Sequence, residues 1–154
     1  MKALISSCLL GRNIKYSGGN NLTPKLVQIL KKYNVELVEV CPEAFGGLSI
    51  PREPAEIING KVLNRVGKDV SLEFEEGAQK TLNLAIKNEV DFVILKERSP
   101  SCGSNYIYDG SFSGKIIPGK GWSAKKLFEN NIKIFSEEEL KEIEEFIKKF
   151  NCGN

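Results

Sequence analysis

The chain has 154 residues, an ordinary globular composition, and 22 basic against 20 acidic side chains, which leaves a net charge of +2. This length is typical of one domain with a sizeable core. The balanced charge excludes nucleic-acid or membrane binding driven by bulk charge, and no apolar run approaches the roughly 20 residues of a membrane-spanning helix. The first residues do not have the pattern of a signal peptide, so we expect a cytoplasmic protein.

Strand-like and helical segments alternate through the first half of the chain. Residues 2–6 predict a first strand, and Thr23 followed by Pro24 predicts the start of a helix, because proline is favoured at the first helical position. The alternating apolar and polar residues of 35–40 predict a second strand. An Asn-Gly turn inside residues 57–63 predicts a β-hairpin.

The alternation continues in the second half. Apolar residues three or four positions apart predict a long helix that begins near Asp69. Residues 90–95 are mostly apolar and predict a buried central strand, and residues 106–117 predict a second small hairpin. Ser123 is expected to cap another helix.

The last part of the chain predicts one more strand and one more helix. Residues 132–135 form the strand, and Ser136–Glu139 matches a capping box at the start of the final helix. Residues 151–154, which include Cys152, are expected to form a frayed tail without a functional role. The order of elements predicts a single α/β domain over residues 1–154, with an open, mostly parallel sheet, flanking helices in a Rossmann-like three-layer arrangement, and small hairpins.

Histidine is absent and four cysteines are present. The absence of histidine excludes His-containing zinc sites, histidine general bases and Ser-His-Asp triads. The cysteines form no C-x-x-C pair, and a cytosolic chain of this size has little need of disulfides. Each cysteine therefore has to be interpreted through its place in the fold.

Three of the four cysteines follow predicted strands. Cys8 follows the strand at 2–6, Cys41 follows the strand at 35–40, and Cys102 lies in a Gly/Pro-containing loop after the strand at 90–95. Because the carboxyl ends of parallel strands share one edge of a sheet, the three thiols could converge there. Three thiolates without histidine suit a soft metal or an iron–sulfur cluster with one iron left open to substrate. The alternative is that they are buried small hydrophobic residues.

The segments around these cysteines resemble the TudS thiouracil desulfidase family. The resemblance runs from Lys2 to about Phe135, and the three cysteine motifs in this order are fairly specific. The matching segments are residues 7–11, 41–52, 67–70, 99–103, 107–110 and 119–121.

The resemblance implies an oxygen-sensitive [4Fe–4S] cluster held by Cys8, Cys41 and Cys102. It implies non-redox removal of sulfur from 2- or 4-thiouracil or 4-thiouridine monophosphate, with release of hydrogen sulfide. It also implies that Glu43 and Ser99 form the acid/base pair.

Further candidates flank the same loops. Basic side chains there could meet a nucleotide phosphate, and we favour Arg52 among them because nearby prolines restrain its backbone. The candidate substrate-binding residues are Arg52, Arg12, Ser101 and Gly103, and Lys15 and Lys96 lie beside them in the sequence pattern.

Two other functional classes stay open. One is a cluster-free α/β module that binds a nucleotide at its sheet edge, and the other is a sulfur carrier that uses cysteine as a nucleophile. The second is weakened by the lack of a C-x-x-C pair and of any histidine to activate a thiol. We expect a small-molecule thiolated base or nucleotide as the partner, no nucleic-acid or membrane partner, and a monomer or homodimer.

Overall fold

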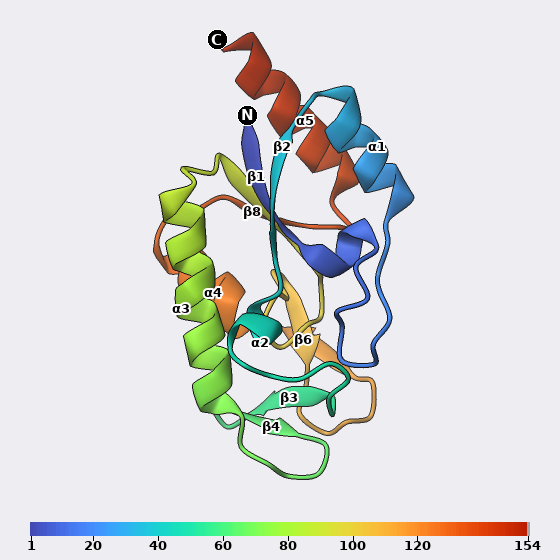
Figure 1. The fold of residues 1–154 in the computed structure, drawn as a ribbon, viewed down its shortest axis with the longest axis vertical. Coiled ribbons are helices and arrows are strands. Elements are labelled where there is room, and N and C mark those ends of the chain that lie inside the picture. The colour runs from blue at the N-terminus through green and yellow to red at the C-terminus, as the bar shows by residue number, and fades with distance from the viewer. Residues whose placement is uncertain (154) are drawn as a thin grey trace.

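A four-stranded parallel sheet in the order β2-β1-β5-β8 organises the protein, whose computed structural model describes residues 1–153 (Figure 1). Central β1 pairs with both neighbours, so that Ala3 lies opposite Leu37 on one side and Phe92 on the other. The strands are β1 (Lys2–Ser6), β2 (Glu36–Val40), β5 (Phe92–Leu95) and β8 (Ile134–Ser136). The predicted parallel α/β fold is confirmed.

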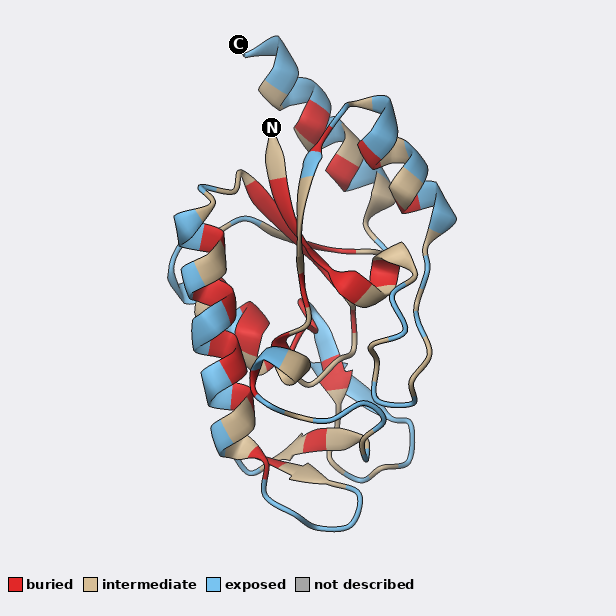
Figure 2. Ribbon diagram, viewed as in Figure 1, coloured by how far each residue is buried: buried red, intermediate tan, exposed pale blue. Residues whose placement is uncertain are grey.

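Two pairs of helices cover the two faces of this sheet. Alternation along β1 places Ala3 and Ile5 in one hydrophobic cluster and Leu4 in the other. The first cluster includes apolar residues of α1 (Pro24–Lys32) and α5 (Leu140–Cys152), and the second those of α3 (Ser71–Lys87) and α4 (Trp122–Glu129). The buried stripes of these helices face the buried strands, which gives three layers (Figure 2).

The carboxyl ends of the sheet strands meet near the middle of the molecule (Figure 1). β1 is followed by the 3-10 turn η1 (Ser7–Leu10), and β2 by the short helix α2 (Pro42–Phe45). The chain then crosses to the other side of β1 to form β5, which makes the β1/β5 junction a topological switch point. Ligands of open α/β sheets bind at such points.

Two antiparallel hairpins lie beyond these strand ends (Figure 1). The first joins β3 (Ala55–Ile58) to β4 (Lys61–Asn64) through the predicted Asn-Gly turn, in which both residues have positive φ. The second joins β6 (Tyr106–Tyr108) to β7 (Ile116–Pro118) through a longer loop. Both hairpins stand next to the switch point. No helix among the described residues is both long enough and apolar enough to cross a membrane.

Helix α2 packs so closely against α3 that glycine is required on both sides. A Cβ on Gly77 would collide with the carbonyl oxygen of Pro42, and a Cβ on Gly46 would collide with that of Glu73. The sequence analysis did not predict α2, because four residues are too few to show helical periodicity. The close packing fixes the position of the residues at the start of α2.

The start of α4 differs from the prediction. The helix begins at Trp122 after Gly121, and Ser123 lies inside its first turn rather than at the cap. The backbone N–H groups of Trp122 and Ser123 donate to the carbonyls of Pro100 and Ser101. A side-chain cap is therefore not needed, because the loop before Cys102 already accepts these hydrogen bonds.

The start and end of α5 also differ from the prediction. Ser136 belongs to β8 and the helix begins at Leu140, although Glu139 still accepts a hydrogen bond from the Ser136 N–H, as in a capping box. The helix continues through Cys152, so residues 151 and 152 of the expected tail are helical, and residue 154 lies outside the described residues.

Candidate active site

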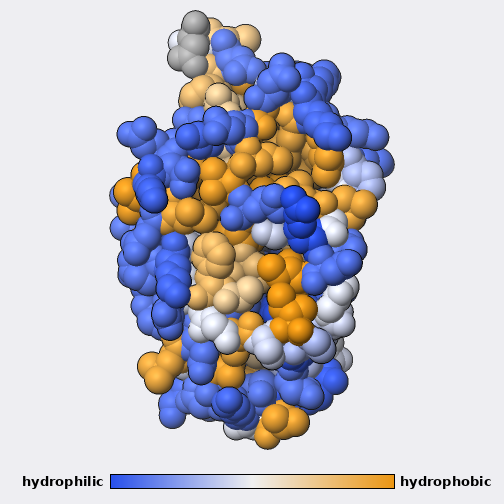
Figure 3. Space-filling model, viewed as in Figure 1, coloured by the Kyte–Doolittle hydropathy of each residue, from blue (hydrophilic) through white to orange (hydrophobic). Residues whose placement is uncertain are grey.

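A cavity of about 400 Å³ opens at the carboxyl ends of β1, β2 and β5. It is lined by the loops that follow these strands and by parts of both hairpins, and it contains all three predicted cysteines. Hydrophilic residues cover much of the molecular face seen in Figure 3, with apolar residues between them. The lining side chains central to the chemistry are Cys8, Cys41, Cys102, Glu43, Arg52, Ser99 and Ser101.

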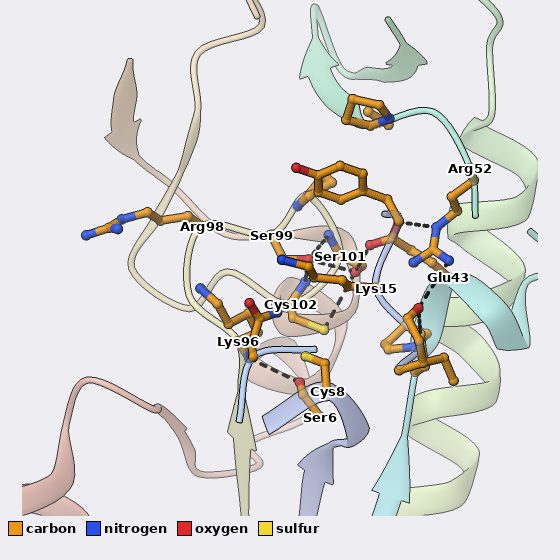
Figure 4. A pocket seen from close by; sticks show the side chains of 18 of the residues that line it. Ser6, Cys8, Lys15, Glu43, Arg52, Lys96, Arg98, Ser99, Ser101 and Cys102 are labelled. Carbon is orange, nitrogen blue, oxygen red and sulfur yellow. Dashed lines mark hydrogen bonds and ion pairs between the residues drawn. The ribbon is translucent and has the colours of Figure 1, made fainter. Parts of the chain in front are cut away.

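Each cysteine reaches the cavity from a different strand. Cys8 lies in η1, Cys41 is the residue that precedes α2, and Cys102 is buried in the loop after β5. All three are free thiols, and the sulfur atoms of Cys8 and Cys102 face one another (Figure 4). Cys152 is exposed at the end of α5 and is not one of the residues that line the cavity. The three cysteines that follow strands in the sequence thus line one cavity in the folded protein.

Burial raises the pKa of each of these thiols. For Cys102 it raises the pKa to about 12, although the nearby hydroxyl groups of Ser6 and Ser101 act in the opposite direction. Burial also raises the pKa of Cys8 and of Cys41. A buried thiol of this kind is a poor nucleophile, because the thiolate is the reactive form. Coordination to a metal deprotonates a thiol, so these residues suit ligation better than nucleophilic attack.

The cavity offers three thiols without histidine, a donor set that suits an iron–sulfur cluster. Among residues 1–153, no three Cys, Asp or Glu side chains are placed to hold a single metal ion. In an iron–sulfur cluster each thiolate binds its own iron, so the sulfurs stand farther apart than around one ion. Three thiols from three loops around one cavity fit such a cluster with one position left open.

A chain of hydrogen bonds joins Arg52 to Ser99 across the cavity. Arg52 Nε donates to Glu43 Oε1 at 3.1 Å, and Ser101 Oγ donates to Glu43 Oε2 at 2.8 Å. Ser101 and Ser99 hydroxyl oxygens are 2.9 Å apart. Because Ser101 has one proton and gives it to the carboxylate, Ser99 must donate to Ser101. The sequence resemblance named Glu43 and Ser99, and the structure places Ser101 between them.

The surroundings of Glu43 hold its carboxyl group in one orientation. The guanidinium group of Arg52 also donates to the backbone carbonyls of Ile14 and Ser49. The side chains of Arg52 and Glu43 are only 8% and 15% exposed, respectively. Arg52 thus uses its Nε and Nη1 atoms to bind Glu43 and two backbone carbonyls.

Glu97 orders the loop that carries Cys102. Its side chain is buried and accepts backbone N–H bonds from Ser104, Asn105 and Tyr106. Burial would raise the pKa of Glu97, but hydrogen bonds from Asn105 and its neighbours outweigh it and lower that pKa below its usual value. Sequence analysis missed Glu97, since nothing in a lone glutamate after a strand signals this role.

Replacing Glu97 with glutamine is expected to lower the free energy of unfolding at pH 7 by roughly 1.5 kcal/mol, because hydrogen bonds to a charged group are stronger. Because folding lowers the pKa of Glu97, its carboxylate contributes fully to stability above the pKa that it has in the unfolded chain. This contribution is lost as the pH falls through the pKa of Glu97 in the folded protein. The difference between parent and variant should therefore shrink below about pH 5. Urea unfolding over a pH series measures it, with the exposed Glu145→Gln as control. A difference independent of pH would contradict this role.

The remaining candidates lie partly outside the cavity. Lys15 and Lys96 line it, and the ammonium group of Lys96 pairs with Glu137. Arg12 is paired with Glu39 on the surface and is not among the lining residues in the described chain. Gly103 is buried in the loop, where a Cβ would collide with the Tyr106 carbonyl oxygen, and it also does not line the cavity.

Other lining residues escaped the sequence analysis. Arg98 lines the cavity, but its guanidinium pairs with Glu138 and points away from the thiols (Figure 4). The hairpins contribute Glu56, Tyr108 and Phe112. Tyr108 belongs to the segment 107–110 that carries the resemblance, whereas Glu56 and Phe112 lie outside all the matching segments and reach the cavity only when the hairpins fold.

Comparison with known proteins supports the resemblance carried by the cysteine motifs. The family model described as 2-thiouracil desulfurase matches residues 3–139. An uncharacterized protein, YbbK of Bacillus subtilis (strain 168), is 43% identical over 150 residues, which cover 91% of this chain and 98% of that protein. A solved structure, described as the [4Fe-4S]-dependent thiouracil desulfidase TudS, superposes with a TM-score of 0.85 at 38% identity. The match covers 92% of this chain and 93% of that one.

Proposed function

The chain belongs to the 2-thiouracil desulfurase family, and we propose that it is a [4Fe–4S]-dependent desulfidase that converts thiolated uracil to the oxo base and hydrogen sulfide. The single observation that supports this most is the convergence of Cys8, Cys41 and Cys102 on one cavity. The same cavity holds the Glu43–Ser101–Ser99 hydrogen-bond chain. The proposed substrates are 2- and 4-thiouracil and 4-thiouridine monophosphate.

The cluster would be held by Cys8, Cys41 and Cys102. When bound, it would supply a Lewis-acidic iron that can coordinate the soft sulfur of a thiocarbonyl group. The net reaction adds water across this group: a carbon–oxygen bond forms, the carbon–sulfur bond breaks, and both protons of the water leave with the sulfur. No electron is gained or lost, so the reaction needs no reductant.

Side chains of the protein would carry out the proton transfers. Glu43 is the general base that takes a proton from the attacking water, and Arg52 holds its carboxyl group in position. Once Glu43 has taken the proton, it can donate to Ser101, and Ser101 to Ser99, so the direction of the hydrogen-bond chain reverses. The hydroxyl proton of Ser99 is then free to be donated to the ring where negative charge develops. The chain of hydroxyl groups gives the proton a path between the two sides of the cavity.

The test is an anaerobic incubation of the cluster-loaded protein in ¹⁸O-water with each of the three thiolated substrates in turn. We expect one equivalent of sulfide per oxo product, and one ¹⁸O atom in each product molecule, without added reductant. Sulfide release by iron-free protein would instead favour a thiol-based sulfur carrier. Binding of the substrates without release would favour a nucleotide-binding module.

A further inference from the structure

Phe112 has an unusual backbone conformation beside the cavity. It lies in the loop between β6 and β7 with φ of 55°, in the left-handed region that bulky side chains rarely adopt. Phe112 lines the same cavity as the three cysteines. Within residues 1–153, Phe112 belongs to none of the hydrophobic clusters that form the core. Core packing therefore does not account for a phenylalanine at this position.

Glu56 on β3 holds this loop in place. The side chain is buried, and its Oε1 atom accepts the backbone N–H of Gly110 at 2.9 Å and of Phe112 at 3.1 Å. Gly110 also packs tightly on β3, since a Cβ there would lie 2.8 Å from Cγ1 of Ile58. The contacts with β3 thus keep Phe112 in a backbone conformation, with positive φ, that phenylalanine rarely adopts.

We propose that Phe112 covers one face of the thiolated pyrimidine ring in the cavity, and that Glu56 is the residue that positions it. The inference rests on the proposed function, which supplies a flat, polarisable heteroaromatic substrate. An aromatic side chain stacks on such a ring regardless of its substituents, and it excludes water from the face that it covers. Phe112 is thereby a determinant of affinity for the ring rather than of the proton transfers.

The first test replaces Phe112 with glycine in the cluster-loaded protein. Glycine accepts the positive φ, so the thermal midpoint should stay unchanged or rise, while KM for 4-thiouracil and the inhibition constant of uracil should both rise about tenfold. Phe112→Tyr keeps the aromatic face and should keep the parental KM. Phe128→Ala, at an exposed phenylalanine on α4, is the matched control. A parental KM in Phe112→Gly would overturn the proposal.

The second test addresses Glu56. Glu56→Ala frees the loop and should raise KM as Phe112→Gly does, with a smaller change in kcat, whereas Glu56→Gln keeps an oxygen that can accept both N–H bonds and should restore the parental KM. A purely structural role would lower the thermal midpoint and leave KM unchanged. If the parent protein releases no sulfide from any of the three proposed substrates, the proposed function fails. If the parent is active and the variants bind normally, only this inference fails.

Discussion

Replacing Glu43 with glutamine is expected to leave iron loading intact and to lower the rate of sulfide release by about two to four orders of magnitude. Glutamine can keep its oxygen on Arg52 Nε and donate an amide N–H to the hydroxyl oxygen of Ser101, which can rotate to accept it, so the loop geometry should survive. It cannot take a proton from water at neutral pH. The effect should therefore fall on kcat rather than on the cluster or the fold.

The matched control for this variant is Glu39→Gln. Glu39 is also a carboxylate paired with an arginine, Arg12, but it lies on β2 outside the cavity. Removing its charge should leave sulfide release within twofold of the parent, a small change on the scale of about 1.4 kcal/mol for a tenfold effect. Iron content and kcat are measured on the same preparations. A parental kcat in Glu43→Gln would exclude Glu43 as the general base.

Replacing Cys102 with alanine is expected to reduce both iron content and sulfide release to background. The three thiols come from three separate loops, so no neighbouring cysteine can take the place of the lost one. Alanine is chosen because a serine oxygen could still coordinate iron. The substitution removes one buried atom, and the variant should remain folded by circular dichroism.

Cys152→Ala is the control for this variant, because Cys152 is a free thiol on the exposed surface of α5. It should load the same amount of iron as the parent and release sulfide at the same rate. Iron retained by Cys102→Ala would show that the cluster is held elsewhere. Iron lost in Cys152→Ala would make Cys152 a ligand, contrary to its place in the fold.

The sequence was sufficient to predict the sheet, and it indicated that the three cysteines could meet at one edge of it. Apolar strands that alternate with helices predict a parallel sheet, and every residue after such a strand lies at the same edge. This rule alone places Cys8, Cys41 and Cys102 at the same edge of the sheet. Their wide separation along the chain conceals the site from any local motif.

The supporting contacts could not be predicted in this way, because they depend on how distant loops pack. Ser101 and Glu43 are 58 positions apart, and Glu56 and Phe112 are 56 positions apart. Ser123 looked like a helix cap because the sequence does not show that the Ser99–Gly103 loop supplies the carbonyls instead. The family resemblance pointed to Glu43 and Ser99, but the roles of Arg52 and Glu97 follow from hydrogen bonds that only the folded chain reveals.

In the proposed reaction, desulfuration depends on a cluster held by the three converging thiols. The most direct test of this dependence is to load the protein anaerobically with increasing amounts of iron and sulfide, and to measure bound iron and the rate of sulfide release from 4-thiouridine monophosphate in each sample. We expect the rate of sulfide release to rise with bound iron and to reach a plateau at about four irons per chain. Release of sulfide at the same rate from iron-free protein would contradict this dependence.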